Sequence, residues 1–214
     1  MTLGTTANPL RVAIIGSGPS AFYAAEHYLK NDLVVEIDMF ERLPTPYGLV
    51  RGGVAPDHPK IKTVTKVYDR TAANLNFRFY GNVNFGTDLT IDDIRAHYHQ
   101  IVFAVGAQTD RRMGIPGEDL ANSHAATEFV GWYNAHPEYR EFQFDLSQET
   151  VAVIGNGNVA MDVARILAST YDELVKTDIA DYALKALTDS KVRDIYVIGR
   201  RAVSYTHLTL PTNR

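Results

Sequence analysis

The stretch RVAIIGSGPSAFYAAEHYLK (Arg11–Lys30) decides the fold, because it joins three kinds of local structure without a break. A short apolar run, Arg11–Ile15, leads into the turn GSGPSA, and a helical segment, Phe22–Lys30, follows. A second apolar run, Val34–Phe40, ends at Glu41. Strand, glycine turn, helix and strand in this order predict a βαβ unit with parallel strands.

The same arrangement returns later in the chain. Val151–Ile154 leads into the turn GNGNVA and a helical stretch, Met161–Ser169. The next apolar run, Ile195–Ile198, is followed by Gly199 and then by Arg200 and Arg201. We therefore predict an α/β fold with two Rossmann-like dinucleotide-binding units, each built on a parallel sheet.

Between and beyond these units the sequence predicts further elements by their composition. A turn-rich polar stretch at 110–120 is a candidate crossing between two domains. The other expected elements are a Pro/Gly-rich loop at Leu43–Pro59, a helix at Ile61–Asn74, strands at Phe77–Tyr80 and Ile101–Val105, and an interrupted helical region at Thr170–Ser190.

The first glycine turn has the residues that a dinucleotide phosphate needs. Gly16 would allow the tight turn, Gly18 would let the backbone approach a pyrophosphate, and Ala21 would permit close packing of helix on strand. The phosphates would lie on free N–H groups at the positive end of the helix. Glu41 could accept hydrogen bonds from ribose hydroxyls and would repel a 2′-phosphate, which indicates FAD or NAD. The alternative is a structural glycine turn beside an incidental surface glutamate.

The second turn repeats the spacing with a different charge at the strand end. Gly155, Gly157 and Ala160 stand where the first turn has its small residues. Arg200 and Arg201 replace the acid, and guanidinium groups there would bind the 2′-phosphate of NADP. The alternative is a solvated pair of surface arginines. Bound FAD together with diffusible NADPH is the simplest assignment of an acid at one site and two cations at the other.

The composition excludes several classes of protein. The chain has 214 residues, no cysteine and a formal net charge of −4. This charge argues against a nucleic-acid partner, and the lack of cysteine excludes thiolate metal sites, an own iron–sulfur cluster and a redox-active disulfide acting on a disulfide substrate. The seven histidines lack zinc-type spacing, so no metal site is expected. No apolar run approaches membrane-spanning length and no leader is evident, so we expect a cytoplasmic protein without a membrane partner.

At this point several motifs together identify a family resemblance. The chain resembles the adrenodoxin-reductase type of ferredoxin–NADP reductase, especially its bacterial members, within the glutathione-reductase-like flavoproteins. The block GLVRGGVAPDHP is too long to match by accident of composition. The residues that carry the resemblance are GSGPSAFYAAE (Gly16–Glu26), PTPYGLVRGGVAPDHPKIK (Pro44–Lys62), AVGAQTDR (Ala104–Arg111), IPGEDL (Ile115–Leu120), TEFVGWYNAHP (Thr127–Pro137), GNGNVAMDVARIL (Gly155–Leu167) and IGRR (Ile198–Arg201).

The resemblance implies two cofactors and their contacts. It implies that FAD is held near Gly16 and Gly18 by Ser20, Glu41, Leu49 and, as a looser match, Phe85. It implies that NADP(H) is held by Arg111, Asn156, Gly157, Asn158, Val159, Arg200 and Arg201.

Three further positions have expected roles. His58 falls where the family has a histidine near the flavin, so it is a candidate catalytic residue, although packing within its loop is the alternative. Trp132 and Tyr133 are expected at the domain interface. Asp162 is expected to have a structural role, such as capping local backbone, rather than a cofactor contact.

The resemblance also implies the reaction and the organisation of the chain. Hydride would pass from NADPH to FAD, and single electrons would pass on to ferredoxin or a similar iron–sulfur protein. We expect an FAD-binding domain at 1–109, an NADP-binding domain at 110–201 and a tail at 202–214 that departs from the family pattern. Because the family continues beyond this point, we expect a truncated NADP-binding unit and an FAD-binding domain without its C-terminal return segment. We therefore expect the fragment to fold poorly and to hold FAD weakly. The alternatives are an FAD/NADPH monooxygenase-like or other two-nucleotide reductase module, or a catalytically silent nucleotide-binding fragment.

Overall fold

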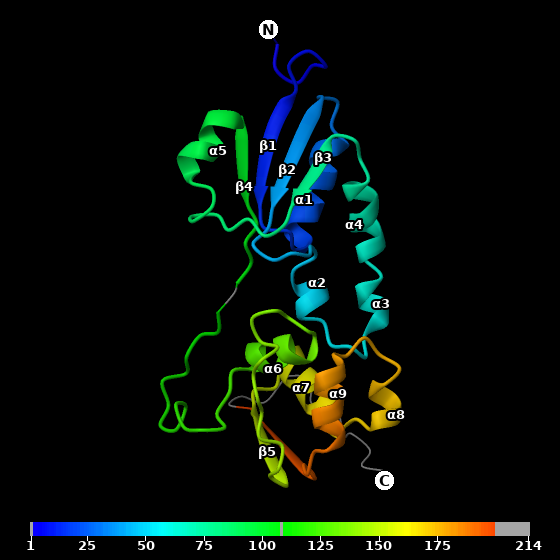
Figure 1. The fold of residues 1–214 in the computed structure, drawn as a ribbon, viewed down its shortest axis with the longest axis vertical. Coiled ribbons are helices and arrows are strands. Elements are labelled where there is room, and N and C mark those ends of the chain that lie inside the picture. The colour runs from blue at the N-terminus through cyan, green and yellow to red at the C-terminus, as the bar shows by residue number, and fades with distance from the viewer. Residues whose placement is uncertain (1, 108, 200–214) are drawn as a thin grey trace.

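The structure is a computed structural model that describes residues 2–107 and 109–199. Its elements form two units that lie one beyond the other along the long axis of the molecule and are joined on one side by an extended connection (Figure 1). Arg200, Arg201 and the tail after them lie outside the described residues.

The first unit is a parallel four-stranded sheet in the order β3-β2-β1-β4. Ile15 and Phe40, the last residues of the two central strands, stand opposite each other in register. The turn after β1 and the acid after β2 therefore lie at the same edge of the sheet. The strands are β1 (Leu10–Ile15), β2 (Val35–Phe40), β3 (Phe77–Tyr80) and β4 (Gln100–Phe103).

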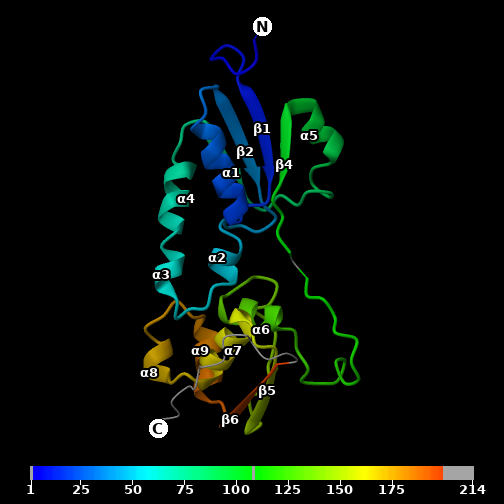
Figure 2. The same ribbon diagram turned by 180° about the vertical axis from the view of Figure 1, so that it is seen from behind.

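Both faces of this sheet are buried, as the near-continuous apolar sequence of its strands requires. Val12 and Ile14 face one way, into a core that Phe22 and Tyr68 complete. Ala13 and Ile15 face the other way, against Ile94. In Figure 2, which shows the molecule from behind, α1 and α4 lie in front of the sheet. The helices of this unit are α1 (Pro19–Leu29), α2 (Leu49–Gly52), α3 (Pro59–Lys62), α4 (Thr65–Ala72) and α5 (Ile91–His97).

The second unit repeats the strand–turn–helix–strand pattern on a smaller sheet. Its two strands pair in parallel, with Ile154 opposite Ile198 at their ends. A single apolar core joins this sheet to the helices around it. The elements are α6 (Ala126–Tyr133), β5 (Thr150–Ile154), α7 (Asn158–Ala168), α8 (Tyr171–Leu174), α9 (Asp181–Thr188) and β6 (Asp194–Ile198).

The two predicted βαβ units are present, and the structure corrects several details around them. The Pro/Gly-rich loop contains a short helix, α2. The expected helix at 61–74 is two helices, α3 and α4, and the strand expected to reach Val105 ends at Phe103. Helices α5 and α6 were not expected. Helix α5 buries Ile94, whereas α6 buries its last five residues.

Candidate functional site

The first glycine turn is shaped by Gly16. This residue has a φ of +99°, and a Cβ added to it would lie 2.4 Å from the carbonyl oxygen of Ala104. Its N–H donates to the carbonyl oxygen of Phe40 at 2.8 Å, which ties the turn to the end of β2. An L side chain therefore fits neither the conformation nor the space. Gly16 is required by the fold whether or not a nucleotide binds.

Gly18 has a different reason to be glycine. It is the N-cap of α1 with an extended backbone, and a Cβ there would meet no atom within 4 Å. The first turn of α1 carries no acidic residue, and Ser20 is exposed in it. The first N–H groups of a helix lack partners within the helix and favour an anion. Gly18 thus leaves an accessible, electropositive helix end, as the dinucleotide interpretation requires.

Glu41 lies beside this turn and is partly buried. One carboxylate oxygen accepts hydrogen bonds from the N–H and the hydroxyl of Ser17, at 3.0 and 2.7 Å. The other accepts from the N–H of Leu43 at 3.0 Å. Since an ionised carboxylate has about four acceptor positions, capacity for a further donor remains. Glu41 therefore organises the turn and has acceptor capacity left over.

The loop that contains α2 packs directly on the first turn. The N–H of Tyr47 donates to the carbonyl oxygen of Ser17 at 3.0 Å. A Cβ on Gly48 would lie 2.9 Å from the Cα of Gly18. Leu49, which begins α2, is 65% exposed beside this contact. Gly16, Gly18, Ser20, Glu41 and Leu49 are thus gathered around one turn.

Phe85 is placed by packing near the same edge of the sheet. Its ring centroid lies 5.3 Å from that of Phe103 in an edge-to-face arrangement, and the ring packs on the cluster around Ile94. This packing gives the partly buried Phe85 a place in the fold whether or not a cofactor binds. A role toward a flavin stays a prediction.

The second glycine turn reproduces the geometry of the first. Gly155 has a φ of +130°, and its N–H donates to the carbonyl oxygen of Ile198 at 2.8 Å. Gly157 is the N-cap of α7, and a Cβ on it would meet no atom within 4 Å. The first turn of α7 likewise carries no acidic residue. Two helix ends of the same shape are therefore presented by one chain.

The side chains predicted to hold the second nucleotide are exposed at this turn. Asn156, Asn158 and Val159 are all exposed, and Gly199 packs so closely on Asn156 that a Cβ on it would lie 2.7 Å from the amide nitrogen. Arg111 is exposed in the connection between the units. The expected phosphate clamp, Arg200 and Arg201, lies outside the described residues.

A charged cluster joins the two units, and the sequence did not predict it. Arg165 of α7 binds both carboxylate oxygens of Asp57, one of them at 2.9 Å. Its Nη2 also donates to Asp162 at 2.7 Å and lies 2.8 Å from the Nε2 of His58. The pKa of Asp57 is lowered by the hydrogen bond from Arg165, and the pKa of Arg165 is raised by the same bond. His58 and Asp162 are therefore members of an ion-paired junction.

Two of the expectations from sequence concern residues of this junction. Asp162 does have a structural role, but it accepts a hydrogen bond from a side chain rather than capping backbone. His58 has a side chain that is 40% exposed, and its Nε2 lies 3.4 Å from Asp162. Its place near a flavin stays a prediction, since the structure describes only its protein neighbours.

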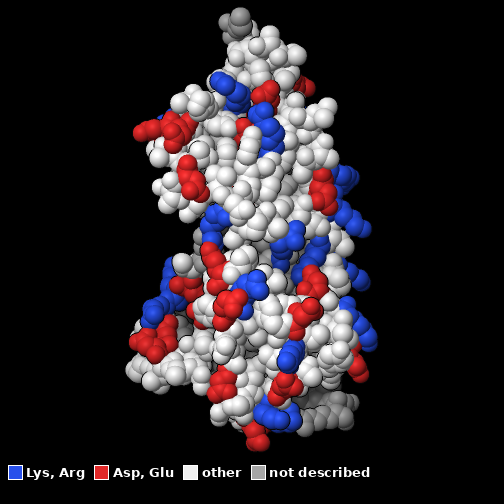
Figure 3. Space-filling model, viewed as in Figure 1, with Lys and Arg blue, Asp and Glu red and all other residues white. Residues whose placement is uncertain are grey.

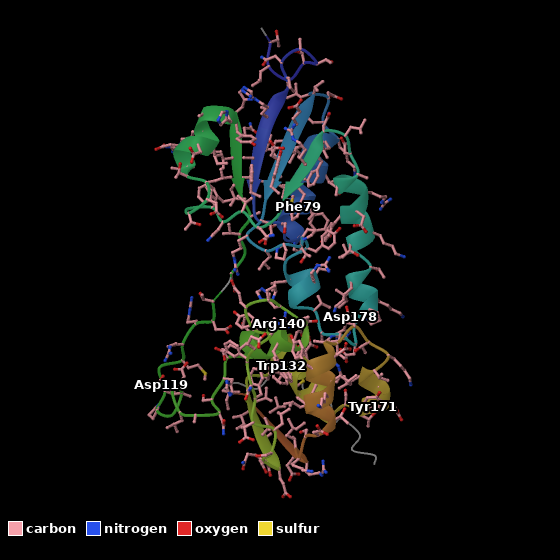
Figure 4. All side chains as sticks on the ribbon, in the orientation of Figure 1. Phe79, Asp119, Trp132, Arg140, Tyr171 and Asp178 are labelled. Atoms are coloured by element: carbon pink, nitrogen blue, oxygen red, sulfur yellow. The ribbon has the colours of Figure 1, made fainter. Side chains whose placement is uncertain are left out.

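Two further pairs cross the same junction. Arg42 binds both oxygens of Glu138, and this hydrogen bond lowers the pKa of Glu138. Lys62 at the end of α3 donates to Asp178 at 2.7 Å. Asp178 is labelled in Figure 4 where α3 meets the second unit. In Figure 3, charged side chains of both signs gather across the band between the two units.

The expectation that Trp132 and Tyr133 lie at the domain interface is only partly right. Trp132 is 4% exposed and stacks on Phe129 within the core of the second unit (Figure 4). Tyr133 is fully buried in the same core, although it is close enough to the junction for Asp162 and Asp57 to add to the effect of burial in raising its pKa. Trp132 and Tyr133 are buried there because they pack against other aromatic side chains of the second unit. The spacing of motifs along the sequence does not show this packing.

The comparisons with known proteins agree with this geometry. The family model described as pyridine nucleotide-disulphide oxidoreductase matches residues 10–198. The chain belongs to this family. Both glycine turns of the chain lie within the matched region.

Several relatives are about half identical to this chain. NADPH-ferredoxin reductase FprA of Mycobacterium tuberculosis is 52% identical over 198 residues, which are 90% of this chain and 43% of the relative. Mitochondrial NADPH:adrenodoxin oxidoreductase of Salvelinus fontinalis is 48% identical over 201 residues, 94% of this chain and 40% of the relative. The chain therefore spans less than half the length of these relatives. The resemblance to the adrenodoxin-reductase type is confirmed.

Solved structures show the same likeness. Mycobacterium tuberculosis FprA in complex with NADPH superimposes with a TM-score of 0.88 at 52% identity, over 91% of this chain and 44% of that chain. Histamine dehydrogenase from Rhizobium sp. 4-9 shares only 16% identity with a TM-score of 0.55, which shows the fold alone. The predicted α/β class with two Rossmann-like units is confirmed.

Within residues 2–107 and 109–199, no helix is long and apolar enough to cross a membrane. Over the same residues, His, Asp and Glu side chains form no group of three that could hold a metal ion.

Proposed function

We propose that this chain is the nucleotide-binding part of an FAD-dependent ferredoxin–NADP reductase. The observation that carries the proposal is the pair of glycine turns, which have the same backbone geometry and both lead into a helix without acidic residues in its first turn. Relatives named as NADPH-ferredoxin and NADPH:adrenodoxin reductases support the same reading.

The residues of the first turn fit FAD. Gly18 would admit the pyrophosphate to the N–H groups of α1, and Glu41 would accept a ribose hydroxyl with its remaining acceptor capacity. Ser20 and Leu49 would complete the contact, with Phe85 as a further candidate. The protein atoms needed are already held in place by Ser17 and by the loop at Tyr47–Gly48.

The residues of the second turn fit NADP(H). Gly157 would admit its pyrophosphate to the N–H groups of α7, and Asn156, Asn158 and Val159 would line the turn. We propose that Arg200 and Arg201 bind the 2′-phosphate and that Arg111 makes a further contact. The supporting argument is one of charge, since a doubly negative phosphate favours guanidinium donors.

When bound, FAD accepts hydride from NADPH and releases electrons singly to an iron–sulfur acceptor. The protein's own part is to hold both nucleotides in register and to exclude competing reactions. We propose a ferredoxin or a similar iron–sulfur protein as the partner, supported by the names of the relatives. The acidic net charge disfavours a nucleic acid, and the lack of cysteine disfavours a disulfide substrate. No membrane partner is proposed. We also propose a cytoplasmic location, as expected from the sequence. His58 is the candidate catalytic side chain.

The experiment uses the protein as its gene encodes it, purified and saturated with FAD. Anaerobic addition of NADPH should bleach the flavin absorbance rapidly, and NADH should do so at least tenfold more slowly. Reduction of an added ferredoxin should follow. Oxygen consumption without any iron–sulfur acceptor would favour a monooxygenase-like module instead. Failure to retain flavin would leave a silent nucleotide-binding fragment as the better description.

A further inference from the structure

Arg165 makes more contacts across the junction than a surface ion pair does. It lies on α7, two turns after the helix begins at the second glycine turn. Its guanidinium binds both oxygens of Asp57, donates to Asp162 at 2.7 Å and lies 2.8 Å from His58 Nε2. A guanidinium only donates hydrogen bonds, so the last contact is a bond in the tautomer with its proton on Nδ1. One side chain thus fixes three groups.

The electrostatics keep this cluster paired. The hydrogen bond from Arg165 lowers the pKa of Asp57, and bonds to Asp57 and Asp162 raise the pKa of Arg165. The carboxylates of Asp57 and Asp162 both bind the guanidinium of Arg165, so its positive charge is fully balanced within the cluster. The side chains of Asp57 and Asp162 are only 24% and 21% exposed. Partial burial and planar two-point bonding restrict the geometry more than an exposed lysine pair would.

The cluster connects the two glycine turns through a short chain of contacts. Asp57 and His58 belong to the loop that also contains Tyr47 and Gly48, and those two residues touch the first turn at Ser17 and Gly18. Arg165 belongs to the helix that Gly157 caps. The other inter-unit pairs reach the second unit at Glu138, after α6, and at Asp178, between α8 and α9. Neither of those partners lies on α7.

We propose that Arg165 is a positioning residue, which sets the separation and angle of the two nucleotide sites by holding the Asp57–His58 segment against α7. This inference rests on the proposed function. Hydride transfer requires reacting atoms about 3–3.5 Å apart, and a misplacement of about 1 Å costs on the order of 100-fold in rate. The bidentate Arg165–Asp57 pair is rigid enough to hold the two units so that the reacting atoms stay within that distance range.

The first test separates positioning from nucleotide binding. In the flavin-loaded full-length protein, Arg165→Met should lower the limiting rate of bleaching by NADPH about 10- to 100-fold. The NADPH concentration at half-saturation should change less than about threefold, because Arg165 contacts neither glycine turn. Arg165→Lys should stay impaired, since an ammonium cannot reproduce the two-point bond. Equal limiting rates in Arg165→Met and wild type would overturn the proposal.

Arg78→Met is the matched control. Arg78 also binds an aspartate through two nitrogens, but its partner, Asp38, is within the first sheet. This variant should lose thermal stability without losing the limiting rate. Should it fail to fold, Lys30→Met breaks an exposed pair with Glu26 and serves instead. A comparable fall in rate in the control would show that the effect of Arg165→Met is general destabilisation, and would refute positioning.

The second test measures geometry without any reaction. The chain has no cysteine, so spin labels at His27→Cys on α1 and Lys185→Cys on α9 would be unique. Arg165→Met and Asp57→Asn should broaden the distance distribution between these labels, while Arg78→Met should leave it unchanged. An unchanged distance distribution in both Arg165→Met and Asp57→Asn would refute the inference. Because this readout needs no NADPH, it remains decisive if the proposed reductase activity itself fails.

Discussion

Ser17 donates two hydrogen bonds to one oxygen of Glu41, from its N–H at 3.0 Å and from its hydroxyl at 2.7 Å. Ser17 is only 1% exposed, so this contact is built into the first glycine turn. The acid that the sequence assigned to a ribose therefore also holds the turn in shape.

Glu41→Ala should weaken FAD binding about 10- to 100-fold, because a charge-assisted hydrogen bond contributes about 1.5–3 kcal/mol. Quenching of flavin fluorescence on titration measures the dissociation constant. Ser17→Ala is the matched control, since it removes one donor to Glu41 and leaves the carboxylate in place. It should change the constant less than about fivefold. Equal losses in both variants would mean that Glu41 acts only by holding the turn.

Gly16→Ala should chiefly lower stability, whereas Gly18→Ala should chiefly weaken binding. Gly16→Ala should lower the Tm by about 5 °C or more, because a Cβ would meet the Ala104 carbonyl oxygen in a conformation of positive φ. Gly18→Ala should change the Tm by less than about 2 °C, since its Cβ would meet nothing and its φ is −75°. It should nevertheless weaken FAD binding at least about tenfold by obstructing the pyrophosphate. Calorimetry measures the Tm of each variant, and flavin titration measures its FAD affinity. Normal FAD affinity in Gly18→Ala would show that FAD does not bind at this turn.

Replacing Arg200 and Arg201 with alanine should raise the KM for NADPH about 100-fold. The KM for NADH should hardly change, because NADH has no 2′-phosphate to bind. Steady-state ferredoxin reduction with each nucleotide provides the comparison. Parallel losses for the two nucleotides would show that these arginines do not recognise the phosphate.

The junction should make stability depend on acidity. The hydrogen bond from Arg165 lowers the pKa of Asp57 below its ordinary value of 3.8, and the bond from Arg42 lowers that of Glu138 below 4.5. A lowered folded-state pKa contributes stability above the unfolded value, and this stability is lost as the pH falls through the folded value. The fall in Tm from about pH 6 to about pH 3.5 should therefore be smaller in Asp57→Asn than in wild type by about 2 °C. Identical falls in the two proteins would mean that the Asp57 pair adds nothing to stability.

Some of what the sequence missed had a local signal. Helix α5 begins with a capping box in which Thr90 and Asp93 bond each other's backbone, and the pattern T-x-x-D is visible in the sequence. Helix α2 had no such signal, because Gly48, Gly52 and Gly53 make its segment resemble a loop. Contacts distant in sequence hold it in place, since Val50 is buried and the N–H of Tyr47 donates to the carbonyl oxygen of Ser17.

The sequence by itself determined the two strand–turn–helix–strand units and the different roles of the glycines in each turn. These features follow from the order of apolar runs, glycine turns and helical segments, which the residue types along the chain show directly. Only the tertiary structure decided that Arg165 would meet Asp57 and His58, and that Trp132 would be buried in the second core. Such pairings join residues far apart in sequence, and their partners are selected by how the two units pack together, which no spacing of motifs along the chain encodes.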